Sequence, residues 1–258
     1  MTAPLAGRRA VITGGGSGIG RGIAEVLVAQ GAEVALIGRR PEPLQAAAQA
    51  LRQQGGRAHA FAGDVRDRDA IGRAVQEAQR AMGGLDVLVN NAGIGGANAC
   101  AFAGPDRWDE VVRTNLDGVF FTTRAALPFL PDGGRIVSIS SVLGRFGVPG
   151  YTAYCASKHG VIGFTKALAL ELAPRRITVN AVCPGWVDTA MAKSGMESIA
   201  RMTGTTYEAA RRSSLAMVPL GRILEPREIG ETVAWLCSPG ASGMTGQAIS
   251  HCGGQVMW

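Results

Sequence analysis

A tyrosine and a lysine stand four residues apart in the segment Tyr154-Cys155-Ala156-Ser157-Lys158, where a long run of helical periodicity begins. This spacing places the phenol and the ammonium on one face of a helix, about 6 Å apart along its axis. A tyrosine that exchanges protons near neutral pH needs its pKa lowered by about three units from about 10, which corresponds to about 4 kcal/mol. A cation about 4 Å away supplies an energy of that order. The pair therefore predicts a proton-transfer site, although the same spacing also arises by chance in many helices.

A glycine-rich turn follows the first predicted strand. It reads Thr13-Gly14-Gly15-Gly16-Ser17-Gly18-Ile19-Gly20 and leads into an amphipathic helical run. Glycines let the backbone turn tightly and approach a pyrophosphate, while the free N–H groups and positive dipole of the helix N-terminus face the phosphates. Such turns also occur for steric reasons alone, but this position between a strand and a helix predicts dinucleotide binding. The candidate contacts are Gly14, Gly16, Ser17, Gly18, Ile19 and Gly20.

The end of the second predicted strand indicates which dinucleotide is bound. In NAD(H)-binding folds, an acidic residue about 20 positions after the glycine turn bonds the ribose 2′-hydroxyl. This chain has Arg39 and Arg40 there instead. A guanidinium forms paired, charge-assisted hydrogen bonds to phosphate oxygens, so NADP(H), with its 2′-phosphate, is the preferred cofactor and NAD(H) the alternative. On the structural interpretation, both arginines only flank a solvated loop before Pro41.

Short apolar runs alternate along the chain with longer runs of helical period. The expected strands are Arg9–Thr13, Glu33–Gly38, Arg57–Ala62, Asp86–Asn90, Arg135–Ser140, Ile177–Ala181 and Gln247–Ser250. The expected helices are Gly18–Gln30, Pro43–Gln53, Asp67–Met82, Arg107–Leu127, Thr152–Ala173 and Pro226–Cys237. Strands such as Val34–Ile37 are apolar at every position, which is typical of a parallel sheet covered by helices on both faces. We therefore expect an α/β fold, a Rossmann-type doubly wound parallel sheet of about seven strands, in a single domain spanning residues 1–258.

Composition argues against several other classes of protein. The 258 residues are 47% hydrophobic and 18% charged, which suits one large core and not a disordered chain. The five cysteines are an odd number without zinc-type spacing, so we expect neither a disulfide framework nor a metal site. The net charge of +6 comes from scattered arginines, so we expect no nucleic-acid partner. Without a bilayer-spanning apolar run or a leader-like start, we expect no membrane association and a cytoplasmic location.

The motifs, taken in order, resemble those of single-domain short-chain dehydrogenases/reductases over essentially the whole chain. They are Thr13-Gly14-x-x-x-Gly18-x-Gly20, Asp64-Val65, Asn90-Asn91-Ala92-Gly93, Thr114-Asn115-Leu116-Asp117-Gly118, Ser141, Tyr154-x-x-x-Lys158 and Pro184-Gly185-x-x-x-Thr189. The segment from Ala156 to Leu168, together with Cys252-Gly253-Gly254, is similar to 3-oxoacyl thioester reductases and polyketide ketoreductases. Many relatives have aspartate where this chain has Cys252, which favours the ketoreductase-like branch.

The resemblance implies a role for each matching residue. Tyr154 is expected to be the general acid in reduction and the base in oxidation, and Ser141 to polarise the substrate carbonyl. Lys158 is expected to lower the tyrosine pKa and hold the nicotinamide ribose, and Asn115 to interrupt its helix and hold a water that links Lys158 to solvent. Further cofactor contacts implied are Asp64 and Val65 at the adenine, Asn90 in the cofactor loop, Val187 and Thr189 at the carboxamide, and Ala92, Gly93, Pro184 and Gly185. On the structural alternative, Ser141 is simply a hydroxyl at a strand end and Asn115 only breaks or caps a helix.

The stretch from Thr189 to Met217 is the least regular part of the pattern. It resembles the family's mobile substrate lid, in which methionines adapt to varied apolar groups, and a plain pair of amphipathic helices is the alternative. Its arginines Arg201, Arg211 and Arg212 are candidates to receive an anionic carrier arm. Phe146, Tyr151 and Trp186 are candidates for an aromatic pocket near the carbonyl.

The expected activity is NADP(H)-dependent reduction of a ketone to a secondary alcohol. The resemblance implies a 3-oxoacyl thioester or a bulky cyclic or aromatic ketone as substrate, and a homotetramer as the assembly. One alternative is an NAD-dependent secondary-alcohol or hydroxyacyl-CoA dehydrogenase. An alternative of another class is a catalytically silent nucleotide-sensing protein.

Overall fold

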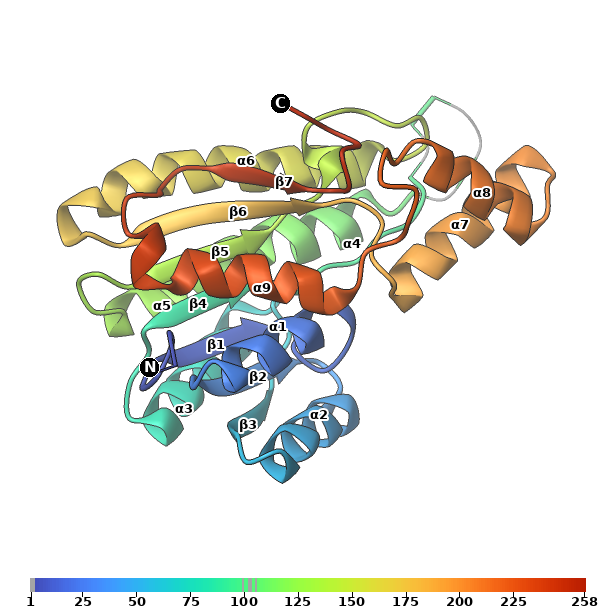
Figure 1. Cartoon of the computed structure of the whole chain (residues 1–258). Coiled ribbons are helices and arrows are strands. Elements are labelled where there is room, and N and C mark those ends of the chain that lie inside the picture. The colour runs from blue at the N-terminus through green and yellow to red at the C-terminus, as the bar shows by residue number, and fades with distance from the viewer. Residues whose placement is uncertain (1–2, 99, 102–103, 105) are drawn as a thin grey trace.

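The computed structural model describes residues 3–98, 100–101, 104 and 106–258. Within these residues, seven parallel strands form one sheet in the order β3-β2-β1-β4-β5-β6-β7 (Figure 1). The strands are β1 (Arg9–Thr13), β2 (Glu33–Gly38), β3 (Arg57–Ala62), β4 (Val87–Asn90), β5 (Arg135–Ile139), β6 (Thr178–Pro184) and β7 (Ala248–His251). The order reverses direction between β1 and β4, which opens a crevice at the carboxyl ends of the strands. The predicted doubly wound α/β fold is confirmed.

Helices cover both faces of this sheet. They are α1 (Gly18–Ala29), α2 (Pro41–Gln53), α3 (Arg68–Met82), α4 (Trp108–Val112), α5 (Gly118–Ala126), α6 (Thr152–Leu172), α7 (Ala190–Thr203), α8 (Tyr207–Ala216) and α9 (Pro226–Cys237). One apolar cluster joins α1, α2 and α9 to the sheet, and a second joins α3, α5 and α6 to its other face. Neighbouring strand residues divide between the two clusters: Ala10 and Ile12 belong to the first, and Val11 to the second. This division explains why the central strands are apolar at every position.

Two predicted elements differ from the structure by more than a shift of one or two residues at their ends. The expected helix Arg107–Leu127 consists of α4, a π-helical turn at Arg113–Asp117 and α5, because one extra residue per turn is accommodated at that point. Strand β6 extends to Pro184 and not to Ala181, because Cys183 and Pro184 still pair with β7. A proline at the last position of a strand costs little, since only the donor it lacks is lost there.

The stretch expected to be the least regular is well-formed helix. Helices α7 and α8 fill most of residues 189–217 and project beyond the carboxyl end of the sheet (Figure 1). Thr189 and Thr206 begin them as N-caps, accepting hydrogen bonds from Ala192 and Ala209. The helical periodicity was hidden because both helices carry many small and polar residues.

None of the helices in the described part of the chain combines the length and apolarity that a bilayer crossing needs. Among the same residues, no group of three or more His, Cys, Asp or Glu side chains is arranged to hold a metal ion.

Candidate active site

A cleft of about 1050 Å³ opens at the carboxyl ends of the strands, between the glycine turn after β1 and helix α7. Most of the predicted site residues line it, although they come from separate parts of the sequence. They are Gly14, Gly16, Ser17, Gly18, Ile19, Arg39, Arg40, Val65, Ala92, Gly93, Ser141, Tyr154, Lys158, Pro184, Gly185, Val187 and Thr189. Gly20, Asp64, Asn90 and Asn115 are not among the lining residues.

The glycine turn has the geometry that close approach of a phosphate requires. Gly14 and Gly18 adopt φ of +67° and +52°, a region that other residues rarely occupy. A Cβ at Gly20 would lie 2.3 Å from the carbonyl oxygen of Gly14, so only glycine lets α1 pack this closely on the turn. The N-terminus of α1 therefore opens directly onto the cleft and offers N–H groups and a positive dipole to an anion.

Asn91, to which the sequence analysis assigned no role, fastens the loop after β4 to the glycine turn. Its side-chain Nδ2 donates to the backbone oxygens of Thr13 at 2.9 Å and Gly14 at 3.3 Å. In return, Thr13 Oγ1 accepts from the backbone N–H groups of Asn91 and Ala92, both at 3.0 Å. The sequence signal for this role was the second of two consecutive asparagines at a strand end, because short amide side chains there often hydrogen-bond to nearby backbone groups.

Positive charge gathers at the end of the cleft beyond β2. Arg39 and Arg40 are exposed there and both line the cleft. Asp64, expected at the adenine, gives its carboxylate to Arg66, with Nη2 to Oδ2 at 2.7 Å. The hydrogen bonds from Arg66 lower the pKa of Asp64, and Arg39 lowers it further through space. The neighbouring residue Val65 lines the cleft, whereas the Asp64 side chain braces the loop.

Asn90 stands at the end of β4 and is not among the residues that line the cleft. It is buried, and its Nδ2 donates to Thr123 Oγ1 of α5 at 3.0 Å. This bond ties the end of β4 to the helix that covers it.

Ser141 and Tyr154 meet in the middle of the cleft. Ser141 is buried where β5 ends, and its Oγ accepts from the backbone N–H of Leu143 at 3.1 Å, which orients the hydroxyl. Burial raises the pKa of Tyr154, and a hydrogen bond with the Ser141 side chain opposes that rise. The phenol therefore stays protonated at neutral pH, which is the state required of a proton donor.

Lys158 lies beside the tyrosine with its backbone and side chain both fixed. Its Nζ donates to the Ile139 carbonyl at 2.8 Å, and Ser140 Oγ donates to the Lys158 carbonyl at 2.9 Å. The Nζ lies 5.7 Å from the centroid of the Tyr154 ring, and burial lowers the pKa of Lys158 to about 8. Burial is the leading influence on the pKa of Tyr154 and raises it, and Lys158 is not among the main groups that shift this pKa, contrary to the expected lowering.

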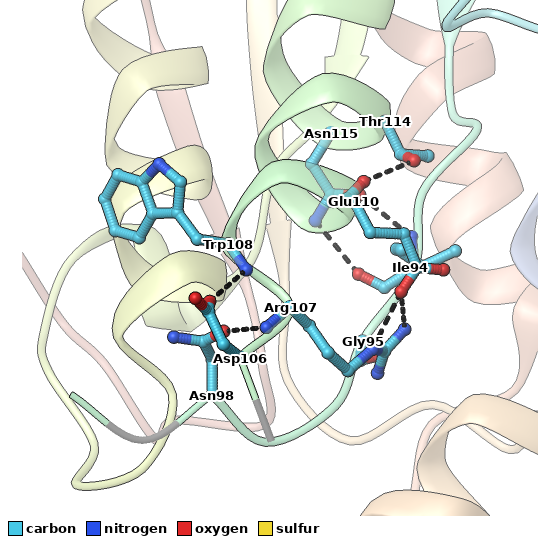
Figure 2. Close-up of polar contacts among 9 residues, drawn as sticks. All are labelled: Ile94, Gly95, Asn98, Asp106, Arg107, Trp108, Glu110, Thr114 and Asn115. Atoms are coloured by element: carbon cyan, nitrogen blue, oxygen red, sulfur yellow. Dashed lines mark hydrogen bonds and ion pairs between the residues drawn. The ribbon is translucent and has the colours of Figure 1, made fainter. Parts of the chain in front are cut away.

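Asn115 stands in the π-helical turn, so the expected interruption of its helix is present. Its Oδ1 accepts from the backbone N–H of Ile94 at 2.8 Å, and its Nδ2 donates to the Ile94 carbonyl at 2.9 Å (Figure 2). The same Nδ2 donates to Ser157 Oγ at 3.3 Å. The amide thus joins the loop after β4 to α6, the helix that carries Tyr154 and Lys158.

Aromatic side chains and methionines also line the cleft. Phe146, Tyr151 and Trp186 line it, as do Met191 and Met217 from the lid region. Arg201 of α7 also lines the cleft, and its charge lowers the pKa of Tyr151, although burial of that phenol raises it more. Arg211 and Arg212 are exposed on α8 and are not lining residues. Of the three candidate arginines, Arg201 alone reaches the cleft.

Comparisons with known proteins agree with this geometry. The family model for short chain dehydrogenase matches residues 8–199. A ketoacyl reductase of the monensin polyketide synthase from Streptomyces virginiae is 44% identical over 251 residues, covering 96% of each chain. A 3-oxoacyl-acyl-carrier-protein reductase from Thermotoga maritima is 38% identical over 255 residues, covering 98% of this chain and 99% of the other. The crystal structure of a variant actinorhodin polyketide ketoreductase with NADPH superimposes with a TM-score of 0.92 at 43% identity and 100% coverage of both chains.

Proposed function

The chain belongs to the short-chain dehydrogenase family, and on that premise we propose that it reduces a ketone to a secondary alcohol with NADPH. One observation carries the proposal. A protonated phenol lies between a hydrogen-bonding serine and a buried lysine, in a cleft continuous with a glycine turn and a cationic rim. The residues that we propose as proton donor, carbonyl polariser and dinucleotide cradle thus line one cleft.

The residues present fit NADPH. The glycine turn and the N-terminus of α1 suit the pyrophosphate, and the guanidinium groups of Arg39 and Arg40 suit the 2′-phosphate. Lys158 would hold the nicotinamide ribose. When bound, NADPH supplies the hydride that adds to the carbonyl carbon.

Further cofactor contacts are proposed at the positions that match the family motifs. Val65 would contact the adenine, and Val187 and Thr189 the carboxamide. Asp64 and Asn90 would act through the loops they brace.

The side chains of this protein then manage the proton. Ser141 Oγ donates a hydrogen bond to the carbonyl oxygen and so polarises the C=O bond. The Tyr154 phenol gives its proton to the same oxygen as the carbon accepts hydride, so the product is a neutral alcohol. The ammonium of Lys158 stabilises the phenolate that remains until a proton returns from solvent. We propose that Asn115, which joins the loop to α6, holds the water through which that proton passes.

The raised pKa of Tyr154 suits the role of general acid in ketone reduction. A general acid must be protonated before the reaction, and burial keeps this phenol so at neutral pH. Alcohol oxidation would require the phenolate first, which the same burial disfavours.

The substrate class we propose is a 3-oxoacyl thioester or a bulky cyclic or aromatic ketone. The aromatic side chains of Phe146, Tyr151 and Trp186, which line the cleft, suit a large apolar body, and the cleft has room for one. Arg201 at the lid suits an anionic group at the far end of a thioester substrate. The two relatives above are named as a ketoacyl reductase and a 3-oxoacyl-acyl-carrier-protein reductase, and these names support the same class of substrate.

We propose in addition that the enzyme is a homotetramer located in the cytoplasm. Phe120 on α5 and Leu170 on α6 are large apolar side chains with 37% and 79% of their surface exposed, which suits burial against other copies. Light scattering coupled to size-exclusion chromatography would give the mass, and a monomer would contradict the assembly. Cell fractionation would test the location.

The deciding experiment follows nicotinamide absorbance with purified protein. Acetoacetyl-CoA and a bicyclic ketone are each offered with NADPH and, separately, with NADH. Turnover with NADPH that is lost in Tyr154→Phe supports the proposal. Preference for NADH with a secondary alcohol would favour an NAD-dependent dehydrogenase, and tight NADPH binding without turnover of any ketone would favour a nucleotide-sensing protein.

A further inference from the structure

Part of the cleft lining is a glycine-containing segment whose backbone is hydrogen-bonded to side chains from other parts of the chain. We call Ile94–Asn98 the strap; its residues from Ile94 to Ala97 line the cleft. A Cβ at Gly95 would lie 3.3 Å from both Cγ and Sδ of Met191, so the strap faces the first turn of the lid helix α7. The strap and the first turn of the lid helix are therefore neighbouring parts of the cleft lining.

Arg107, which also lines the cleft, holds the strap by a hydrogen bond (Figure 2). Its Nη1 donates to the carbonyl of Gly95 at 3.0 Å. Its Nε and Nη2 both bind Glu110 Oε2 at 2.8 Å, which fixes the guanidinium and neutralises its charge. A Cβ at Gly96 would lie 2.1 Å from Nη1, so the guanidinium lies directly against the strap backbone.

The far end of the strap connects Arg107 to the catalytic helix. Asn98 Oδ1 accepts from the backbone N–H of Arg107, and the backbone N–H of Asn98 donates to Gly150 at 2.7 Å. Thr152 Oγ1 donates to the carbonyl of Asn98 at 2.9 Å and accepts from its Nδ2 at 3.2 Å. Thr152 is the first residue of α6, two positions before Tyr154. The strap is thus fixed relative to the proton donor.

We propose that Arg107 is a positioning residue, and this proposal rests on the proposed function. Arg107 fixes the position of the strap in the cleft lining and so determines the size of ketone that the site accepts. Asn115 fixes the strap at Ile94, and Arg107 fixes the next residue, Gly95. Because Glu110 already pairs with Arg107, the guanidinium acts as a fixed wall element and not as a receptor for an anionic substrate. Removing it frees the Gly95 carbonyl and opens space in the cleft wall, which weakens the hold on a compact ketone and admits a bulky one.

The test compares a short acyclic 3-oxo ester with a bicyclic ketone. In Arg107→Ala, we expect KM for the compact ester to rise about tenfold, with kcat changed less than about threefold for both substrates. KM for the bicyclic ketone is expected to stay constant or fall, so the preference ratio shifts about tenfold toward the larger substrate. Arg107→Lys keeps one donor for Gly95 and should restore about half of the shift on a logarithmic scale.

Two further variants guard against a purely structural effect. Arg113→Ala removes an exposed arginine from the same helical run and should leave the preference unchanged. Glu110→Gln keeps the size of the side chain but removes the charge that fixes Arg107, and should shift the preference about threefold in the same direction. NADPH affinity, measured by fluorescence, should be equal in all of them, which shows that each variant is folded.

The outcomes separate the two claims. If the wild-type protein reduces neither ketone with NADPH, the proposed function is wrong. If the wild-type protein reduces both, and Arg107→Ala and Glu110→Gln keep the wild-type preference ratio or lower kcat equally for both substrates, the function stands and the role of Arg107 is overturned.

Discussion

Replacing Lys158 by methionine should stabilise the protein while abolishing its activity. Burial lowers the pKa of Lys158 from 10.5 to about 8, so the folded protein holds the charged ammonium less favourably than the unfolded chain does. A difference of about 2.5 units corresponds to about 3 kcal/mol in favour of unfolding at neutral pH. The Nζ hydrogen bond to Ile139, at 2.8 Å, returns about 1 kcal/mol that the variant loses. The net gain for Lys158→Met is then about 2 kcal/mol at pH 7.

The sign of the pH dependence follows from the same shift. Below pH 8 the lysine is protonated in both states, and the folded protein bears the full cost of burying the charge. Between pH 8 and 10.5 the folded protein has released the proton and the unfolded chain has not, so wild-type stability rises relative to the variant. The advantage of Lys158→Met should therefore be full at pH 7 and reversed at pH 10.5, where only the lost hydrogen bond of about 1 kcal/mol remains.

Differential scanning calorimetry at the two pH values measures this difference. For a chain of this size, about 2 kcal/mol corresponds to a Tm higher by about 4 to 8 °C at pH 7. Lys166→Met, which replaces an exposed lysine on the same helix, is the matched control and should change Tm little at either pH. A Lys158→Met protein that is no more stable than wild type at pH 7, or whose advantage persists undiminished at pH 10.5, would refute the reasoning.

Four further outcomes are expected. Tyr154→Phe should lower kcat for ketone reduction about 1000-fold at unchanged NADPH affinity, and a loss below tenfold in steady-state assays would contradict its role as proton donor. In the double variant Arg39→Ser with Arg40→Ser, the KM for NADPH should rise about 100-fold while that for NADH stays constant; equal changes for both cofactors would remove the 2′-phosphate assignment. Because the Lys158 pKa is about 8, kcat/KM for reduction should fall as pH rises above 8, and a flat profile to pH 9.5 would exclude the charged lysine from the rate. Gly20→Ala, whose Cβ would lie 2.3 Å from a backbone oxygen, should weaken NADPH binding at least tenfold by fluorescence titration, whereas Gly72→Ala, whose Cβ meets open space, should not.

The fold was predictable because its signals are local and repeated. Runs such as Val34–Ile37 and the glycine turn at Gly14–Gly20 each imply a buried strand or a strand-to-helix junction without knowledge of distant contacts. The structure places both where the sequence predicts, and most of the predicted site residues then converge on one cleft because parallel strands end at the same edge.

What the sequence could not show depends on partners far apart in the chain. Asp64 was matched to an adenine contact, but whether its carboxylate is free depends on the rotamer of Arg66, which binds it. The pKa of Tyr154 depends on how deeply the surrounding loops bury it, so the expected lowering by Lys158 gave way to a rise. Arg107 carried no motif at all, and its contacts with the strap become visible only when the two segments are placed side by side.

The π-helical turn at Arg113–Asp117 joins α4 to α5, and it changes which face of α5 is aligned with a given face of α4. An extra residue in a turn rotates everything after it by about 100° relative to a continuous α-helix. Helix α4 packs against α6, and α5 packs against α3, so each half meets its own neighbour at its own angle. Substitutions that repack α5 on α3 can therefore accumulate without turning Asn115 away from Ile94. Deleting one residue within the turn would couple the two halves. If α5 then kept its packing on α3, the Asn115 amide would be rotated away from the loop that it holds.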